Sequence, residues 1–345
     1  MKIKFLIFVI GLGLFSACEK DEPVYIPNSI ISELGDEKVW VVNEGGFQNG
    51  NASLSIITKD SEAIQNNVFD QINNKKLGDI FQSVAFYGES AFLVINNSGK
   101  IEKVNRFNLE AEGTIEGLTS PRYFLAVSES KAYVTDLFEK AISIVNTQTF
   151  EITGKLKTSG WTETIKMFQG KIYVLNASKS MIYTLDAVND VLSDSTEIGL
   201  PNPNSFEMDV DGNIWVLCGG ESWNNLNGGL VKLDGNLKKL ATIPFSNLSS
   251  GSHLVKTLDG DSLYFLYEGL KKMGVNQTSI PSINYVETPT GVNFYSLGIQ
   301  PITGTIFLGD AVDFVQNGKV YQYSASGILK NEFESGINPG RFYFD

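Results

Sequence analysis

The sequence predicts an all-β fold, a seven-bladed β-propeller, and three observations lead to this expectation. A short phrase of an apolar residue, an aromatic residue and further apolar residues recurs seven times, with the aromatic at positions 40, 92, 133, 173, 215, 264 and 307. Successive copies are 40 to 52 residues apart, about the length of a four-stranded blade. Polar turns flank the phrases, and no long stretch has a helical period.

Each repeat contains the signals of four strands. A short apolar strand such as 123–126 comes first and leads into the strand that holds the aromatic residue. Tight polar turns join these two strands, as at Gln169-Gly170. A third strand with alternating apolar residues follows, as in 142–146, and then a fourth such as 153–156. The copy at 266–290 is the least regular, because lysines and prolines interrupt its pattern.

The two ends of the chain complement each other. The first blade starts at the strand around Trp40 and lacks the strand that precedes the aromatic in the other blades. Residues 338–344 repeat the phrase of that missing strand, which 120–124 show in full. We therefore expect the C-terminal strand to pair beside the N-terminal blade, which covers two open sheet edges and closes residues 38–345 into one domain.

The N-terminal residues predict targeting rather than fold. Two lysines precede an apolar stretch, 5–15, that is shorter than the roughly 20 residues a membrane span needs. Residues 15–18 resemble the bacterial lipobox, in which the signal is cut before a cysteine, here Cys18, whose thiol then receives lipid. An ordinary secretory signal cut near Ala17 is the alternative. We expect a signal peptide at 1–17.

Residues 18–22 resemble the surface-export tag of Bacteroidetes-type lipoproteins, in which a lysine and two acids follow the lipidated cysteine. This resemblance implies a protein anchored by lipid to the outer membrane and exposed at the cell surface. Residues 18–37, which include two prolines, are then a lipidated tether between the membrane and the fold.

Composition argues against several classes of protein. The formal net charge is −12, and only three of the cationic residues are arginines, so a nucleic-acid interface is not expected. A single histidine, His253, argues against a His-rich metal site. Nucleophile-elbow, Cys-x-x-Cys and phosphate-loop motifs are missing, so we expect no catalytic residue, metal or cofactor. A carboxylate pair drawn from Glu44, Asp136 and Asp310 stays open as an alternative.

The candidate ligand-binding residues come from one face of the predicted ring. In an antiparallel blade, the end of the second strand and the start of the first lie at the same face. The residues expected there are aromatic or amide-rich, as a face that binds a bulky ligand of mixed polarity requires. They are Asn43, Phe47, Gln82, Asn96, Arg122, Tyr123, Phe138, Trp161, Asn176, Asn204, Trp223, His253, Tyr267, Phe294, Arg341 and Phe342.

Some of these candidates, and a few other residues with chemically suggestive side chains, also have purely structural interpretations. Arg122 and Arg341 could instead bind carbonyl groups at the channel mouth. His253 is expected to be a hydrogen-bonded residue at a strand start rather than a catalyst, since no second histidine shares the role. Residues 209–213 are similar to the start of a calcium loop, but a hairpin turn is favoured because the twelfth position lacks glutamate. Cys218 is expected to be buried.

A set of motifs recurs in one family in the same order. The motifs are 42–47, 51–55, 77–79, 82–83, 96–101 and 120–123. On these residues the sequence resembles the YncE-like seven-bladed propeller lipoproteins of the Bacteroidetes surface, and among them the BtuG-type cobalamin-binding group. The blade pattern covers about 38–345, whereas the motifs lie in the first 125 residues. The loops at 219–229 and 266–290 depart from the pattern.

The resemblance implies a function. It implies a surface lipoprotein that binds cobalamin or another corrinoid on the propeller face and passes it to a TonB-dependent outer-membrane transporter. Two alternatives stay open. One is a glycan- or peptide-binding protein of another uptake system, and the other is a lyase or hydrolase on the same fold.

Overall fold

The computed structural model describes residues 37–58 and 63–345. The expected signal peptide, the lipidation site Cys18 and nearly all of the tether lie outside the described residues. Within them, no helix is long and apolar enough to cross a membrane.

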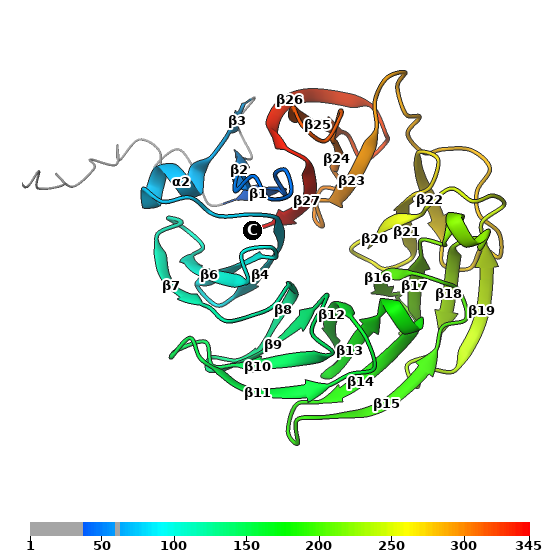
Figure 1. Cartoon of the computed structure of the whole chain (residues 1–345). Helices are drawn as coiled ribbons and strands as arrows, with labels where there is room; N and C mark the ends of the chain where they lie inside the picture. The colour runs from blue at the N-terminus through cyan, green and yellow to red at the C-terminus, as the bar shows by residue number, and fades with distance from the viewer. Residues whose placement is uncertain (1–36, 59–62) are drawn as a thin grey trace, which may run out of the picture.

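Seven small antiparallel sheets are arranged in a ring around a central axis, which confirms the predicted propeller (Figure 1). From the axis outward, the first three sheets are β27 (Pro339–Phe344), β1 (Lys38–Asn43), β2 (Ser53–Thr58) and β3 (Ile64–Gln65); β4 (Phe81–Tyr87), β5 (Ser90–Ile95), β6 (Lys100–Asn105) and β7 (Ala111–Ile115); and β8 (Pro121–Ser128), β9 (Lys131–Asp136), β10 (Ala141–Val145) and β11 (Ile152–Lys157).

The other four sheets follow in chain order. They are β12 (Thr162–Phe168), β13 (Lys171–Asn176), β14 (Met181–Asp186) and β15 (Val191–Glu197); β16 (Pro203–Met208), β17 (Ile214–Cys218), β18 (Gly229–Leu233) and β19 (Lys239–Pro244); β20 (Ser252–Lys256), β21 (Ser262–Leu266) and β22 (Leu270–Gly274); and β23 (Phe294–Ile299), β24 (Ile306–Asp310), β25 (Asn317–Tyr323) and β26 (Leu329–Ile337).

Ring closure by the C-terminal strand is confirmed. β27 pairs antiparallel with β1 and is the innermost strand of the first blade, with Trp40 opposite Tyr343 and Val42 opposite Arg341. Beyond β27, the side chain of the last residue, Asp345, forms an ion pair with Arg106 of the second blade. The chain ends are thereby joined to each other and to the neighbouring blade.

The seven recurring aromatics explain the core. Each lies on the second strand of its blade and is buried. Their clusters join neighbouring blades: Tyr173 of β13 packs with Phe206 of β16 in the next blade, with ring centroids 6.5 Å apart. Burial of one such ring between two blades stabilises the fold by about 2–3 kcal/mol, as judged from the apolar area removed from water. The core therefore lies between blades rather than in one central mass.

Two features differ from a regular four-stranded repeat. The 52-residue interval after Trp40 contains a short helix, α2 (Val68–Asn73), whose apolar residues are buried against the first blade. The sixth sheet has three strands instead of the expected four, because residues 275–293 pair with it only through the bridge between Leu270 and Val286. Two single-turn 3₁₀ helices, η1 (Ala177–Lys179) and η2 (Ser222–Asn224), lie in loops.

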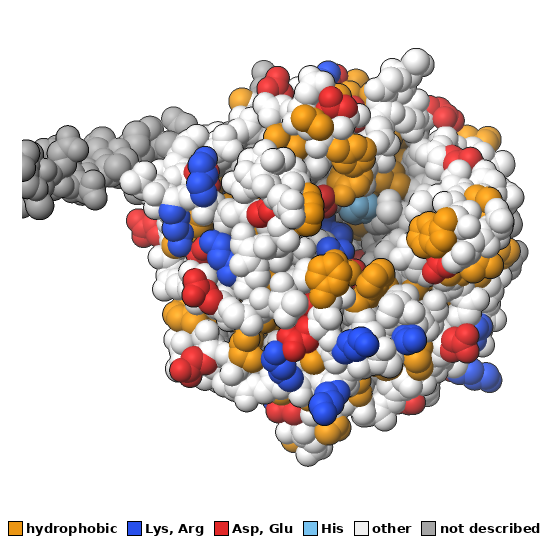
Figure 2. Space-filling view, in the orientation of Figure 1, with side chains coloured by type: hydrophobic (Ala, Val, Ile, Leu, Met, Phe, Trp, Pro, Cys, Tyr) orange, Lys and Arg blue, Asp and Glu red, His pale blue; other side chains and the backbone are white. Residues whose placement is uncertain are grey.

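The register places the predicted site residues at one end of the ring. Second-strand ends pair with inner-strand starts, as Asp136 does with Pro121 and Asp310 with Phe294. We call this end the rim face, and the other end, where β1 begins at Lys38, the opposite face. Figure 2 shows apolar side chains around a central hollow, with the pale-blue side chain of His253, the one histidine of the sequence, inside it.

Candidate functional site

Each inner strand has a β-bulge close to its start on the rim face. The pairing register shifts there in all seven blades, so one residue has no partner opposite it. The residues at or next to these bulges define the chemistry of the axis. They are Gln82, Arg122, Glu163, Asn204, His253, Tyr295 and, in the first blade, Gly340, which Arg341 follows.

Arg122 and Glu163 form an ion pair across two neighbouring blades. The Arg122 Nε–H group is 3.1 Å from each Glu163 carboxylate oxygen, and Nη1 donates to the Gln82 side chain. Despite the desolvation that opposes it, the Glu163 charge helps to raise the pKa of Arg122. The sequence prediction included Gln82 and Arg122 but missed Glu163.

Glu44 reaches the axis from the end of β1. The Tyr295 hydroxyl donates a hydrogen bond of 2.8 Å to its Oε2 atom. Burial raises the pKa of Glu44 above its usual range, although Tyr295, Arg341 and Arg122 favour the charged form. Gly340 gives this carboxyl its room, because a Cβ atom there would stand 2.5 Å from Glu44 Oε1.

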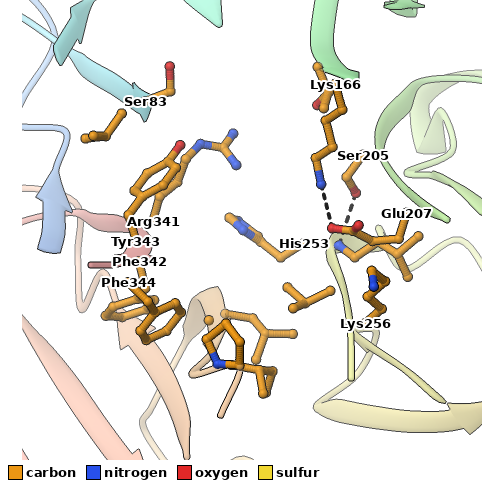
Figure 3. Close-up of a pocket in the computed structure, with 18 of the residues that line it drawn as sticks. Ser83, Lys166, Ser205, Glu207, His253, Lys256, Arg341, Phe342, Tyr343 and Phe344 are labelled. Carbon is orange, nitrogen blue, oxygen red and sulfur yellow. Dashed lines mark hydrogen bonds and ion pairs between the residues drawn. The ribbon is translucent and has the colours of Figure 1, made fainter. Parts of the chain in front are cut away.

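Arg341 and His253 lie near each other on the axis (Figure 3). The Arg341 Nε–H group donates to the Gln82 carbonyl oxygen at 3.0 Å, and the guanidinium carbon is 5.1 Å from the centroid of the Tyr123 ring. His253 has a left-handed backbone with φ of 55°, which a non-glycine residue adopts at some strain. Burial and the nearby Arg341 charge lower the pKa of His253 to about 3, so the ring is neutral near pH 7.

Four predicted aromatics are exposed on the rim face, each from a different blade. Phe47, Phe138 and Trp223 expose 65%, 71% and 75% of their surface, and Trp161 exposes 37%. Trp223 lies in η2, within the loop 219–229 that distinguishes this chain from the regular repeat. Exposed apolar side chains that gather into a patch on one face are typical of a binding surface.

Other predicted residues are buried and bonded within the protein. The Asn43 amide donates to Ser55 Oγ at 2.7 Å, and that of Asn96 donates to the Pro121 carbonyl at 2.9 Å. The Asn176 amide likewise donates to Tyr183 at 3.0 Å.

Tyr267 stacks on Phe245 with centroids 3.9 Å apart, and Phe342 packs against Phe307. Asn204 donates to the Gly251 carbonyl, and Phe294 packs edge-on against Tyr321. The strand pattern predicts where these residues lie along their strands, but it does not distinguish a buried side chain from an exposed one there.

The possible carboxylate pair finds no support in the contacts. Asp136 accepts hydrogen bonds from the backbone of Ser120, Phe138 and Glu139, and so fixes a loop. Asp310 accepts from the backbone of Asn293 and Val312 in the same way. Both carboxylates are therefore used within their own blades.

Two structural interpretations are confirmed. Residues 209–213 form the hairpin turn between β16 and β17, where Asp209 accepts hydrogen bonds from the backbone of Asn213 and from the Trp215 indole. Cys218 is buried, and burial raises the pKa of its thiol. Across the described residues, no three His, Cys, Asp or Glu side chains are grouped closely enough to hold a metal ion.

Comparison with known structures shows the same fold. The chain is similar to a quinonprotein alcohol dehydrogenase-like protein from Bacteroides thetaiotaomicron, with 14% identity and a TM-score of 0.70 over 90% of this chain and 78% of that one. It is also similar to a candidate 6-phosphogluconolactonase from Bacteroides fragilis, with 12% identity and a TM-score of 0.68 over 90% and 98% of the two chains. A third similar structure is the WD40 β-propeller domain of Doa1, with 14% identity and a TM-score of 0.58 over 80% and 87%.

At such identities the likeness concerns the fold alone. No curated protein matches the sequence. Residues 37–309 match the family described as "Domain of unknown function (DUF5074)". The chain therefore belongs to the DUF5074 family, and its fold is a β-propeller.

Proposed function

We propose that this protein is a non-enzymatic binding protein that captures cobalamin or another corrinoid on its rim face. The observation that carries the proposal is the set of four exposed aromatics, from four blades, on the rim face, where Figure 2 shows a central hollow. Aromatic side chains provide a large contact area at a low entropic cost, and such surfaces are typical of sites for bulky ligands.

A corrinoid fits this surface chemically. It combines a broad apolar ring system with amide side chains at its edge, so it needs aromatic surface and hydrogen-bonding groups together. Exposed amides accompany the rim aromatics, with Asn49 close to Phe47 in one loop and Asn224 next to Trp223 in another. Each amide both donates and accepts, which suits an amide partner.

A binding protein is proposed rather than an enzyme because the three carboxylates considered for catalysis are hydrogen-bonded within the protein. Asp136 and Asp310 are held by backbone donors, and Glu44 is held by Tyr295. A general acid and a general base need carboxylates that reach a substrate from the open face. The fixed, bonded positions of these three side chains favour binding without turnover.

The place of action is part of the same proposal. The lipobox-like residues before Cys18 support a lipid-anchored protein of the outer membrane, exposed at the cell surface. A TonB-dependent outer-membrane transporter is the expected partner, to which the captured ligand passes. The two similar Bacteroides structures are compatible with a source of this kind.

Isothermal titration with cyanocobalamin tests the ligand. The proposal expects one ligand per protein, with saturation at micromolar concentrations or below. Absence of heat and of co-purified visible absorbance at micromolar ligand would refute the corrinoid, while leaving the fold unaffected.

A glycan-binding protein is the second candidate, because exposed aromatic rings such as Trp223 and Phe138 also stack on sugar rings. A glycan array with the same protein separates the two candidates. Binding of one class of glycan, together with no binding of cyanocobalamin, would identify the protein as a glycan-binding protein of another uptake system.

A further inference from the structure

The central hollow on the rim face leads into a cavity on the axis. Its volume is about 500 Å³, within the range of sites for small molecules. The inner strands of the blades form its walls, and it extends from His253 and Arg341 toward Leu258 and Pro301 near the opposite face. It continues from the hollow in which Figure 2 shows His253, but its lining includes none of the four exposed rim aromatics, so the side chains proposed to bind here differ from those proposed to bind the corrinoid.

The charge of the cavity is opposite to that of the protein. The chain is acidic, with a formal net charge of −12. The charged side chains that line the cavity are nevertheless Arg341, Lys166 and Lys256 against a single carboxylate, Glu207. Lys166 forms an ion pair with Glu207 at 2.5 Å (Figure 3), which leaves an excess of positive charge from the other two. A cleft with a cationic lining and low-dielectric walls concentrates anions.

Arg341 is the group best placed to receive one. The other two arginines have carboxylate partners: Arg122 pairs with Glu163 at 3.1 Å, and Arg106 with Asp345. Arg341 has no carboxylate within ion-pair distance among the residues that the structure describes, and only its Nε–H donates to a protein acceptor, the Gln82 carbonyl. Its two terminal NH₂ groups are the donors that bind carboxylate or phosphate as a fork.

The surroundings keep that guanidinium charged and in place. Tyr123, Tyr343 and Glu44 raise the pKa of Arg341 against the cost of burial. The Tyr123 ring lies against one face of the guanidinium. His253 stays neutral near pH 7, since burial lowers its pKa to about 3, so it neither repels the arginine with a full charge nor neutralises it.

The rest of the lining is largely apolar. Phe342 and Phe344 lie on the same side as Arg341 in Figure 3, and Leu254, Leu297 and Ile299 continue the apolar wall. A ligand that fits both parts has an anionic group at one end and an apolar body at the other. We propose that the axial cavity binds a small organic anion, whose carboxylate or phosphate group pairs with Arg341 and whose apolar body lies against the Phe344 and Leu297 side chains.

Titration calorimetry with small aryl probes tests this site. The probes are phenyl phosphate, benzoate, and benzamide as the neutral analogue of benzoate. Phenyl phosphate and benzoate bind with millimolar or better affinity, benzamide binds at least about tenfold more weakly, and the tighter of the two anions identifies the preferred head group. This comparison uses the unaltered protein and so does not depend on a variant's folding.

The Arg341→Gln variant tests the contact, with Lys319→Gln as its matched control. Lys319 is a surface cation on β25 that pairs with Glu332, so its loss removes the same charge away from the axis. Arg341→Gln is expected to lose affinity for the better anion about tenfold or more, and Lys319→Gln to retain it.

The nuclear magnetic resonance signal of His253, the one histidine of a protein without a tag, reports whether the probe enters the cavity. The signal shifts as the anion binds beside Arg341. Equal binding of benzoate and benzamide, or unchanged affinity in a folded Arg341→Gln variant, contradicts the proposal, as does a His253 signal that stays fixed at saturating phenyl phosphate. The Trp223→Ala variant retains phenyl phosphate binding, so this site and the corrinoid proposal fail separately.

Discussion

At the scale of single residues, the bulge position of each inner strand decides what the axis can do. At the bulges of three consecutive blades, Arg122 donates hydrogen bonds to both Gln82 and Glu163. The bulges of β20 and β23 place His253 and Tyr295 on the opposite side of the axis. Backbone irregularity thus supplies a polar layer inside an otherwise apolar ring. Its members are satisfied mostly by each other, so they form a fixed floor beneath the rim.

His253 provides a pH test of this floor. Its pKa in the folded protein is about 3, below its ordinary value of 6.5, because burial and Arg341 disfavour the charged ring. A depressed folded pKa contributes stability above pH 6.5 that is lost as the pH falls toward 3. On acidification from pH 7 to pH 4, the unfolding free energy of the wild type should therefore fall more steeply than that of His253→Gln.

Urea unfolding at a series of pH values measures this difference. The His253 ring signal should also stay constant between pH 5 and pH 8. A His253 signal that titrates near pH 6.5 would show that the ring is neither buried nor influenced by Arg341.

Glu44 should show the opposite pH dependence. Its pKa is raised in the folded protein because burial disfavours the carboxylate. A raised folded pKa contributes stability below about pH 4.5 that is lost as the pH rises through the folded value. Glu44→Gln, which still accepts the Tyr295 hydrogen bond, should become progressively more stable relative to the wild type as the pH rises from 4 to 8. A difference between the two proteins that is constant over this range would contradict the assignment.

Prediction from sequence was least complete at this scale, for a physical reason. The strand pattern predicts Trp161 and Phe294 at the inner-strand starts, whereas the axial residues of those blades are Glu163 and Tyr295. A bulge adds one residue to a strand and changes which side chain points to the axis, and it leaves little trace in a hydrophobic pattern. Aligning the inner-strand starts with Arg122 would have identified Glu163.

At the scale of elements, the C-terminal strand determines closure. β27 supplies the inner strand of the first blade, and its Phe342 and Phe344 pack on Phe307 of the preceding blade. Deletion of residues 338–345 removes this pairing, exposes the inner edge of β1 and uncovers Phe307. We expect the truncated protein to lose its cooperative melting transition, as measured by circular dichroism. A soluble truncated protein with an unchanged melting temperature would refute this role.

The strands themselves were predictable because their signal is local. An alternating run with a buried aromatic identifies the second strand of every blade, and the phrase of 120–124 identifies its inner strand. The irregular pattern of 266–290 indicates where the sixth blade departs from the repeat, and this blade has three strands instead of four. The helix α2 was not predicted, since six residues are too few to establish a helical period.

At the scale of the whole molecule, the ring separates two faces with different surroundings. The described chain enters through Lys38 of β1 at the opposite face, whereas the exposed aromatics lie on the rim face. The proposed lipid anchor precedes Lys38 in the chain, and the proposed ligand-binding surface is the rim face. The closed domain follows from sequence, because repeat number and chain ends suffice to derive it. The identity of the ligand cannot be derived in this way, because the exposure of the aromatic side chains in loops depends on tertiary packing.

The most direct test of the central proposal is a cyanocobalamin titration of the double variant Phe138→Ala/Trp223→Ala. Both side chains are exposed on the rim face, so their loss should leave the melting temperature unchanged within a few degrees. Phe107→Ala is the matched control, since Phe107 is an exposed aromatic in the turn after β6, at the opposite face. We predict that the wild type and Phe107→Ala bind cyanocobalamin alike and that the double variant binds at least about tenfold more weakly. Equal affinity in all three proteins, or no binding by the wild type, would contradict it.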